Sequence, residues 1–227
     1  MCGAYGFLGT SGFQKSVNLL LRFQLENNIK PEDGWNIRPS MKALIVTRNS
    51  PNKGVMSTFG YKPAWSESMM LINAKSETVA ELPTYKKMFR ESRCLVPASY
   101  FFEWQKNEGL KQPYCIKVKN NNAISFAGLY NEQGFVIITT KPNELMEPIH
   151  NRMPVILTEE EEDIWLNPDT DESKLLSMLT PFPADKMEAY PVSSLVNSAK
   201  IQSKEVIIPL KPLKDVLKSS QPNLFED

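Results

Sequence analysis

Cys2 directly follows the initiator methionine, so removal of Met1 would leave a thiol and an α-amine on adjacent carbons. The amine has a reference pKa of ~7.7–8.0 and can attack an aldehyde to form a Schiff base. The thiol can then add to the imine carbon and close a five-membered thiazolidine. Taken alone, the position also fits a small residue tolerated at a terminus, since inert cysteines are common. The role of Cys2 therefore depends on its neighbours.

Two further residues could move protons beside such a nucleophile. Glu103 lies inside the aromatic run RCLVPASYFFEWQ, where alternation puts Phe101, Glu103 and Gln105 on one face of a strand. In a partly desolvated cleft the pKa of Glu103 would rise, making it a proton carrier near neutral pH. His150 is the only histidine of the chain, so any imidazole chemistry must take place there. A solvent-facing Glu103 and a purely structural His150 are the alternatives.

The stretch INAKSETV alternates polar and small residues in a way that suits the lining of a cleft. Asn73, Lys75 and Glu77 alternate with Ala74 and Ser76 at what we expect to be the end of a strand. The same letters also fit an ordinary strand-to-helix junction with Ser76 or Asn73 as the cap. The pattern alone does not decide between them.

The elements that must position these residues are mostly strands. After Pro31 the chain contains short segments rich in β-branched and aromatic residues, separated by the turn-forming stretches NSPNKG, KNEGLKQP, KNNN and NEQG. We expect hairpins joined in a mostly antiparallel sheet, within a β-rich α+β fold. The segments are ALIVT, GVMSTFGY, RCLVPASYFFEW, YCIKVK, AISFAGLY and GFVIITT.

Three helices are expected around the strands. Apolar spacing predicts an amphipathic helix from Ser11 to Asn28, and another helix is expected over Glu172 to Leu179. The stretch LTEEEEDIWL predicts a helix start rather than an acidic metal site, with Thr158 as N-cap and Glu161 completing a capping box. Beyond Pro209 the periodicity is lost, and we expect a docked or frayed extension.

Composition indicates one globular chain without a strong preference for a partner. The 227 residues show no linker, 41% are hydrophobic, 23% are charged, and the formal net charge is zero. Binding to nucleic acid would therefore need a local basic patch. No apolar run approaches the ~20 residues of a membrane helix, and no signal peptide is evident, so we expect a cytoplasmic or nucleoid location. Cys2, Cys94 and Cys115 form no C-x-x-C pair and no zinc pattern.

Taken together and in order, these motifs resemble those of the SRAP family, the SOS-response-associated peptidases or abasic-site processing proteins. The matching pieces are MCG-Y at the start, WNIRPS near residue 36, FGYKPAW at 59–65, NAKSE at 73, RCLVPASYFFEW at 93 and HNRMP at 150. They span most of the chain, and six ordered motifs are an implausible chance match.

The resemblance implies a single SRAP domain over residues 1–210, with a barrel-like β core and flanking helices, followed by a C-terminal extension over 211–227. It implies recognition of abasic sites in single-stranded DNA and a covalent thiazolidine link through Cys2 after Met1 is lost, with self-processing as one route. No cofactor and no metal ion is implied. We expect a monomer, with replication-fork proteins as further partners.

The resemblance also assigns roles to the other candidate residues. Asn73 would orient the Cys2 amine or the opened sugar. Glu103 would move protons during ring opening and Schiff-base formation, and His150 would steady and protonate the sugar hydroxyl. Two aromatic residues, Phe59 and Trp65, would offer ring faces for base stacking, worth roughly 1–3 kcal/mol per base, unless they belong to the core. Four polar side chains are expected to contact DNA phosphates, namely Asn36, Arg38, Lys75 and Arg152.

The chain departs from the family pattern at five positions without losing a reacting group. Ala4 and Lys75 stand where the family usually has arginines, so one phosphate contact is lost and another loses its bidentate fork. Arg38 stands where a small residue is usual, and we expect it to compensate. Phe59 replaces a tryptophan and Ser99 a glycine.

Two other functions stay open at this point. One is a cysteine peptidase that uses Cys2 on peptide bonds, although the sequence shows no evident oxyanion hole. The other is a non-catalytic module that binds single-stranded DNA. No G-x-S-x-G, P-loop or dinucleotide fingerprint occurs in the chain.

Overall fold

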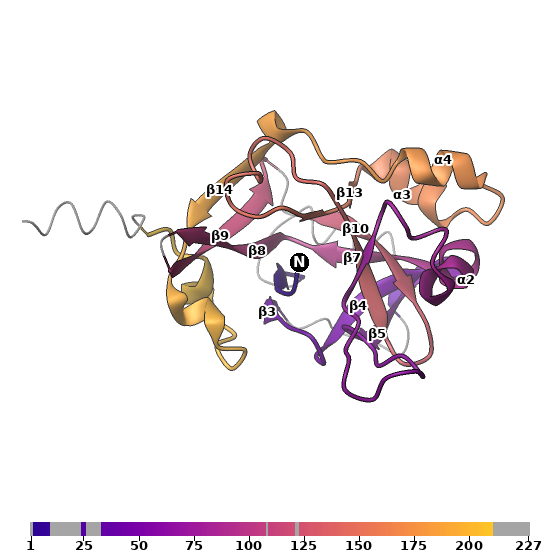
Figure 1. Cartoon of the computed structure of the whole chain (residues 1–227), viewed down its shortest axis with the longest axis horizontal. Helices are drawn as coiled ribbons and strands as arrows, with labels where there is room; N and C mark the ends of the chain where they lie inside the picture. Colours follow the sequence, from indigo (N-terminus) through magenta and orange to yellow (C-terminus); the bar gives the residue numbers. More distant parts are fainter. Residues whose placement is uncertain (1, 10–23, 26–32, 108, 121–122, 211–227) are drawn as a thin grey trace, which may run out of the picture.

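The structure is a computed structural model that describes residues 2–9, 24–25, 33–107, 109–120 and 123–210. Its described strands form two sheets, and the chain begins near the middle of the view in Figure 1, with its first strand in the smaller sheet. The smaller sheet has the order β14-β9-β8-β1-β3. Its strands are β1 (Tyr5–Phe7), β3 (Gly34–Ile37), β8 (Tyr100–Asn107), β9 (Leu110–Val118) and β14 (Met187–Pro191).

The larger sheet has the order β12-β11-β10-β7-β4-β5-β2, with β13 also pairing with β10 and β6 with β11. Its strands are β2 (Gln24–Leu25), β4 (Lys42–Thr47), β5 (Ser50–Thr58), β6 (Asn73–Lys75), β7 (Arg93–Ala98), β10 (Ile124–Tyr130), β11 (Phe135–Thr140), β12 (Met153–Pro154) and β13 (Ile156–Leu157). The β6–β11 and β2–β5 pairs are parallel, whereas the backbone pairings within β1–β8–β9 and β4–β7–β10 are antiparallel. The β-rich, mostly antiparallel α+β fold is therefore confirmed.

Two details of the expected architecture are not confirmed. The described sheets are open, with β14 and β3 at the edges of one and β12 and β2 at the ends of the other, so a barrel-like core is not confirmed. The KNNN stretch also does not close a hairpin, because β9 pairs with β8 and β14 while β10 pairs with β7, β11 and β13. This connection passes from one sheet to the other.

The run RCLVPASYFFEW links the two sheets at the centre of the molecule. Its first half is β7 in the larger sheet and its second half is β8 in the smaller one, with Ser99 between them. The Ser99 amide donates to the Gly6 carbonyl, and its hydroxyl accepts from the Leu8 amide at 3.1 Å. The bend therefore fixes β1, and with it Cys2, against both sheets.

Successive side chains point to opposite faces of each strand and contribute to three apolar clusters. The first lies between the sheets and includes Cys2, Phe101 and Phe126. The second lies between the larger sheet and the helices and includes Leu95 and Trp165. The third covers the opposite face of the smaller sheet and includes Ala4, Tyr100, Phe102, Val196 and Val206. Phe101 thus faces the central core while its neighbours Tyr100 and Phe102 face outward.

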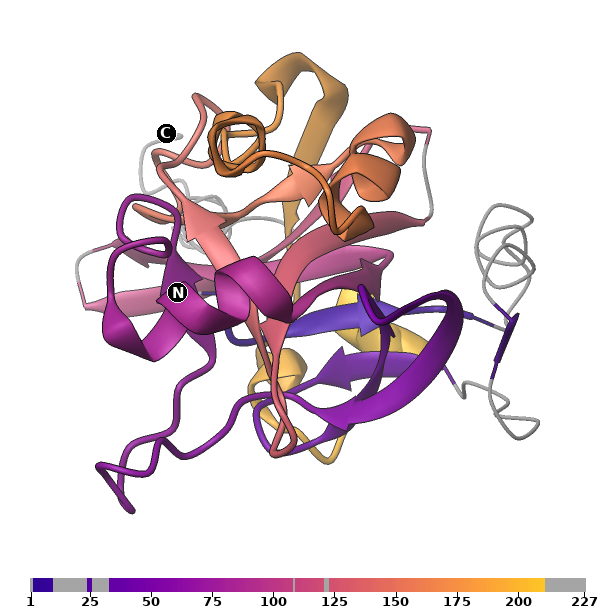
Figure 2. The same ribbon diagram turned by 90° about the vertical axis from the view of Figure 1, so that its right-hand side faces the viewer.

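Three α-helices lie against the outer face of the larger sheet, as Figure 2 shows for the side viewed there. They are α2 (Pro83–Glu91), α3 (Glu159–Leu166) and α4 (Glu172–Ser177). The capping box of α3 is confirmed, since the Thr158 hydroxyl accepts from the Glu161 amide at 3.3 Å and the Thr158 amide donates to the Glu161 carboxylate at 2.9 Å. The helix expected over Glu172 to Leu179 is confirmed as α4, which ends two residues earlier. The described residues also contain short 3₁₀ turns, namely η2 (Ala184–Lys186), η3 (Ser194–Asn197) and η4 (Lys204–Ile207).

Some expectations fall on residues outside the described ranges. The helix predicted from Ser11 to Asn28 lies there, except for Gln24–Leu25, which form the short strand β2 instead. The predicted C-terminal extension over 211–227 lies there entirely. The helix α2 was not predicted, although Pro83 at its first turn and the buried pair Tyr85 and Phe89 are helix signals. Among the described residues, no helix combines the length and apolar character needed to cross a membrane.

Candidate functional site

Cys2 lies at the centre of the molecule, between the two sheets. Its side chain is completely buried in the central apolar cluster, and its thiol is free. Burial raises the pKa of this thiol well above its usual range, and the nearby negative charge of Glu103 raises it further. The thiol is therefore protonated at neutral pH and becomes a nucleophile only when a positive charge forms beside it or a base removes its proton.

Asn73 holds the backbone of Cys2. It begins β6, whose parallel pairing with β11 sets Asn73 opposite Ile137. Its Nδ2 donates to the Cys2 carbonyl at 3.2 Å and to the Ile137 carbonyl at 3.3 Å. Its Oδ1 is buried and has no hydrogen-bond partner within the described residues. The amide therefore fixes the position of Cys2 and keeps one acceptor available for another donor.

Glu103 projects from β8 into the same interior. Alternation places it on the Phe101 face, as the sequence indicates, and its side chain is 3% exposed. Burial raises the pKa of its carboxyl to about 7. A carboxyl with this pKa exchanges protons readily at neutral pH, which suits a proton carrier. The solvent-facing alternative is thus not what the structure shows.

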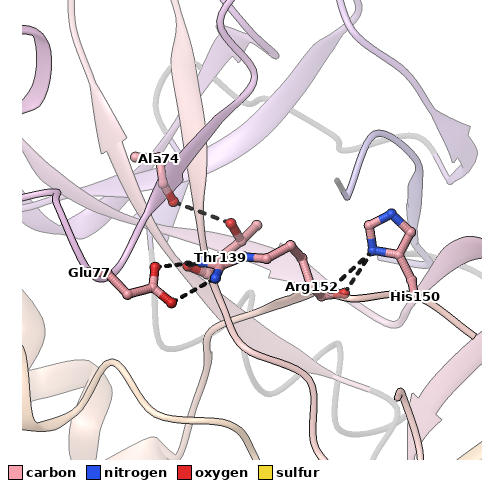
Figure 3. Close-up of polar contacts among 5 residues, drawn as sticks. All are labelled: Ala74, Glu77, Thr139, His150 and Arg152. Atoms are coloured by element: carbon pink, nitrogen blue, oxygen red, sulfur yellow. Dashed lines mark hydrogen bonds and ion pairs between the residues drawn. The ribbon is translucent and has the colours of Figure 1, made fainter. Parts of the chain in front are cut away.

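His150 lies beside Glu103, with 3.8 Å between its Nε2 and Glu103 Oε2. Its Nδ1 lies 3.1 Å from the Arg152 amide nitrogen and 3.2 Å from the Arg152 carbonyl oxygen; when Nδ1 accepts from the amide, the neutral ring carries its proton on Nε2, facing Glu103. Burial lowers the pKa of the imidazole. His150 is therefore neutral at neutral pH, and in that tautomer its Nε2–H faces the carboxyl (Figure 3 shows its Nδ1 beside Arg152).

Arg152 and Lys75 lie at the edge of this cluster. The Arg152 guanidinium forms a bidentate pair with Glu77, at 2.6 Å and 2.8 Å, and its Nη2 also donates to the Thr139 carbonyl at 2.5 Å. Lys75 ends β6 with an exposed side chain. Of these two cations, Lys75 faces solvent, whereas Arg152 is largely engaged within the protein.

Asn36 and Arg38 are engaged by a distant part of the chain. The Asn36 side chain is buried, and its Nδ2 donates to the carbonyls of Val196 and Ser198 at 3.0 Å and 3.1 Å. Its Oδ1 accepts from Arg38 Nε at 2.9 Å, while Arg38 Nη2 donates to the Val196 carbonyl. In this arrangement Asn36 orients Arg38 and does not itself face solvent.

The two predicted stacking residues have opposite environments. Phe59 is completely buried and its ring stacks on Phe135 with 5.3 Å between centroids, so the structure corrects the expectation of an open face and places this ring in the core. Trp65 is 62% exposed. It lies in a loop whose ends are joined by hydrogen bonds between Tyr61 and Leu71. Only Trp65 of the pair presents its ring to solvent.

Sequence reasoning missed Trp104 and Glu77 as site residues. Trp104 follows Glu103, its Nε1 donates to Asn197 Oδ1 at 2.8 Å, and the Arg38 guanidinium lies 5.1 Å from its ring centroid. The aromatic letters beside Glu103 were a signal for Trp104. Glu77 was named only as part of an alternating stretch, because its partner Arg152 lies 75 positions away.

Ala4, one of the positions that departs from the family pattern, places no charge in the structure. Ala4 is completely buried in the cluster behind the smaller sheet, and its carbonyl accepts from the Phe102 amide at 2.9 Å.

Among the described residues, no group of three His, Cys, Asp or Glu side chains has the arrangement of a metal site. The site is thus a buried thiol, an amide, a carboxyl and an imidazole, which together can bind and move protons around one reacting centre.

Comparison with known proteins agrees with the order of the motifs. The family model described as "SOS response associated peptidase (SRAP)" matches residues 1–199. The abasic site processing protein YoqW of Bacillus subtilis (strain 168) is 40% identical over 226 residues, covering 91% of this chain and 99% of its own length. The abasic site processing protein YedK of Escherichia coli (strain K12) is 27% identical over 225 residues, covering 92% and 100%.

A solved structure supports the same fold. The crystal structure of a protein from Bacteroides thetaiotaomicron matches with a TM-score of 0.78 at 28% identity, covering 92% of this chain and all of the other. The described sheets and helices therefore represent an arrangement that occurs in a related, experimentally determined structure.

Proposed function

Because the chain belongs to the SOS response associated peptidase (SRAP) family, we propose that it processes abasic sites in DNA. The proposed reaction is a covalent cross-link through Cys2 to an abasic site in single-stranded DNA. The observation that carries this proposal is the convergence of four groups from separate strands and loops. Asn73 binds the Cys2 backbone, Glu103 acts on the Cys2 pKa, and His150 faces Glu103.

The first step would use the α-amine of Cys2 after Met1 is removed. An abasic deoxyribose is a masked aldehyde, and the neutral amine adds to its C1′ once the sugar ring opens. Loss of one water from the resulting carbinolamine gives an iminium ion. Glu103 supplies the proton that the departing hydroxyl needs, since a pKa of about 7 leaves part of this carboxyl protonated at neutral pH.

The thiol of Cys2 would act in the second step. The iminium charge favours the thiolate, whose formation burial otherwise suppresses. The thiol proton passes to the Glu103 carboxylate, the sulfur bonds to C1′, and the electron pair of the C=N bond returns to nitrogen. The product is a thiazolidine, and one water is released overall. Without the iminium there is no electron sink for β-elimination, so the DNA strand stays intact.

Asn73 and His150 would position the reactants. The free Oδ1 of Asn73 is available to accept from the Cys2 amine or from a hydroxyl of the opened sugar. The imidazole of His150, which is 22% exposed, is proposed to donate to a hydroxyl of the opened sugar. Both groups are fixed by hydrogen bonds to backbone atoms, so little reorganisation is needed when DNA binds.

Removal of Met1 is proposed as a single self-processing event. Hydrolysis of the Met1–Cys2 peptide bond consumes one water and frees the Cys2 amine. A general cysteine peptidase is disfavoured, since a fully buried thiol with a raised pKa is a poor nucleophile toward a peptide from solvent.

DNA would be held at the open edge of the site. Lys75 and Trp65 are exposed and are proposed to contact a phosphate and a base. Arg38 is proposed to add positive charge beside Trp104, with Asn36 holding it in place. The protein is proposed to act as a monomer on DNA in the cytoplasm, with replication-fork proteins as further partners.

The decisive experiment mixes the protein with a single-stranded oligonucleotide that contains one abasic site. We expect a species that survives a denaturing gel and whose mass equals protein without Met1 plus DNA minus one water. An adduct of other mass would contradict the thiazolidine. Binding that disappears on denaturation would indicate a non-catalytic DNA-binding module instead.

Cys2→Ser is expected to lose the stable adduct while keeping some strand cleavage through the imine. The serine variant retains the α-amine but has no thiol to trap the iminium, so borohydride should still reduce and capture an imine. The control is Cys115→Ala, which removes another buried free cysteine outside the central cluster and should cross-link normally. An undiminished heat-stable adduct from Cys2→Ser would disprove the mechanism.

A further inference from the structure

The carboxylate of Glu77 lies outside the four reacting groups but is tied to them through Arg152. Both of its oxygens accept from the guanidinium, at 2.6 Å and 2.8 Å (Figure 3). The Arg152 hydrogen bonds lower the pKa of Glu77 to about 2, so the pair is ionised throughout the neutral range. The Arg152 side chain is 14% exposed and that of Glu77 50% exposed, so the pair lies partly at the surface.

The backbone of the same arginine orients the histidine. The Arg152 amide donates to His150 Nδ1 at 3.1 Å, and the Arg152 carbonyl lies 3.2 Å from the same nitrogen. These contacts decide which ring nitrogen faces Glu103. Any movement of the Arg152 backbone would therefore rotate the imidazole or free its tautomer.

One carbonyl joins this loop to the strand that carries Asn73. The Thr139 carbonyl accepts from both Arg152 Nη2 and the Ser76 amide, the latter at 2.8 Å. The Thr139 hydroxyl donates to the Ala74 carbonyl at 3.4 Å. Glu77 follows directly after this junction, so one ion pair connects the end of β6 with the His150 loop.

We propose that Glu77 is a positioning residue. Its ion pair with Arg152 holds His150 in place relative to Glu103 and relative to β6, the strand that carries Asn73. The catalytic consequence rests on the proposed function, whereas the positioning itself is a property of the free protein. Glu77 touches none of the reacting atoms. It acts by fixing two segments that are 75 positions apart in the sequence.

Donor counting limits what Arg152 has left for DNA. A guanidinium has five N–H donors, and the Glu77 and Thr139 contacts use three of them. The Nε is buried and has no partner within the described residues. One Nη1 donor therefore remains for a phosphate, so Glu77 restricts Arg152 to a single directed contact while it supports His150.

The proposal is tested by NMR of the free protein, because His150 is the only histidine of the chain. Tag-free protein labelled with ¹⁵N-histidine gives imidazole signals from this residue alone. At a pH where the ring is neutral, we expect the parent to show one tautomer, protonated on Nε2. In Glu77→Gln, an amide N–H2 faces the guanidinium, and we expect signals averaged between the two tautomers.

Glu172→Gln provides the matched control. Glu172 pairs with Arg90 at 2.9 Å and is about as exposed as Glu77, but this pair joins α4 to α2. The control should keep the parent imidazole spectrum. Thermal melting followed by circular dichroism identifies any variant that is not folded, and Glu77→Ala serves as a second variant in which no new donor is introduced.

Cross-linking to the abasic oligonucleotide supplies the functional arm. We expect the rate for Glu77→Gln to fall on the order of tenfold to a hundredfold, as for a lost supporting contact. Unchanged imidazole signals in folded Glu77→Gln and Glu77→Ala would overturn the proposal. Changed signals with an unchanged rate would support the positioning role and overturn its catalytic consequence. If the parent itself forms no adduct, the proposed function fails while the NMR result still decides the positioning role.

Discussion

Two arginines donate to different kinds of acceptor, and the contrast separates the helical side of the molecule from the reactive site. Arg93 begins β7, is 1% exposed, and its guanidinium lies 5.7 Å from the ring centroid of Trp165. Carbonyls at the end of a helix lack partners within that helix and carry its negative dipole end. Arg93 satisfies four carbonyls of this kind at the ends of α2 and α3, namely those of Phe89, Arg90, Trp165 and Asn167.

Arg152 belongs to a region where some buried polar atoms have no hydrogen-bond partner in the described part of the chain. Its guanidinium binds a carboxylate and one carbonyl, and its Nε stays buried without a partner in the described part of the chain. Asn73 Oδ1 and the Tyr5 hydroxyl share that condition. Each such atom costs roughly 1–3 kcal/mol, which native proteins tolerate mainly at functional sites. Another such atom, Ser125 Oγ, lies in β10 on the same strand face as Ala127 of the second cluster, so unpartnered atoms are not confined to the Cys2 side. The contrast therefore rests on the two arginines: Arg93 uses its donors on helix ends, whereas Arg152 keeps donors beside the candidate site.

Arg93→Met gives the largest expected change in stability. Methionine keeps an unbranched apolar side chain but removes every donor, so four carbonyls lose a hydrogen bond from Arg93. The carbonyls of Arg90 and Asn167 keep another donor, from the Arg48 guanidinium and the Thr170 amide. Burial lowers the pKa of Arg93 to about 10, so the parent residue is still charged at neutral pH. We expect the free energy of unfolding, measured in urea, to fall by about 3–5 kcal/mol. Adduct formation per folded molecule should stay unchanged, and a selective loss of that activity would erase the contrast.

Glu103 gives the opposite kind of prediction, because its burial destabilises the charged form. Its folded-state pKa is raised to about 7, so the folded protein binds this proton more tightly than the unfolded chain does. The contribution of the carboxyl is therefore fully favourable below the unfolded pKa of ~4.5 and is lost as pH rises through about 7. The slope is ~1.4 kcal/mol per pH unit within that window, and the total loss is on the order of 3 kcal/mol.

Glu103→Gln should remove this pH dependence of the free energy of unfolding. It should also stabilise the protein, whereas Arg93→Met destabilises it. We expect the variant to be more stable than the parent above pH ~7, in urea titrations across the window, because no charge is buried. Its cross-linking rate should fall about 10²–10⁴-fold, since the proton carrier is gone. A parallel pH dependence in parent and variant would show that another group is responsible for it.

The parts of the fold that were predicted depend on neighbours in the sequence. The predicted strand segments overlap observed strands because alternation and β-branched residues report on the sheet face locally. The turns were placed less well, since NSPNKG lies largely within β5 and KNEGLKQP largely within β8 and β9. The cap of α3 was correct because Thr158 and Glu161 lie within one turn. Assignment of strands to two sheets was not predicted, since pairing depends on contacts far apart in the sequence, as between β9 and β14.

The site shows the same division. Cys2, Asn73, Glu103 and His150 were named because each lies in a distinctive motif, and the structure brings them together. The environments of Asn36 and Arg38 were not foreseen, because their partner Val196 lies 160 and 158 positions away. An aromatic residue within an apolar motif suits either a core or a stacking surface, so burial of Phe59 could not be read from its type.

Thr158→Ala is the smallest of these perturbations and the most local test of the contrast. It removes the hydroxyl that accepts from the Glu161 amide, and we expect the free energy of unfolding in urea to fall by ~1 kcal/mol. The control is Glu160→Gln, which changes the charge of the same exposed turn without removing a cap, and should stay within ~0.5 kcal/mol. Cross-linking should be unaffected by either change, because α3 packs on the outer face of the larger sheet while Cys2 lies on its inner side. Since α3 follows β13, which pairs with β10, a lower cross-linking rate at unchanged stability would mean that the helix cap influences the site through the sheet, and the two regions would then not be separate.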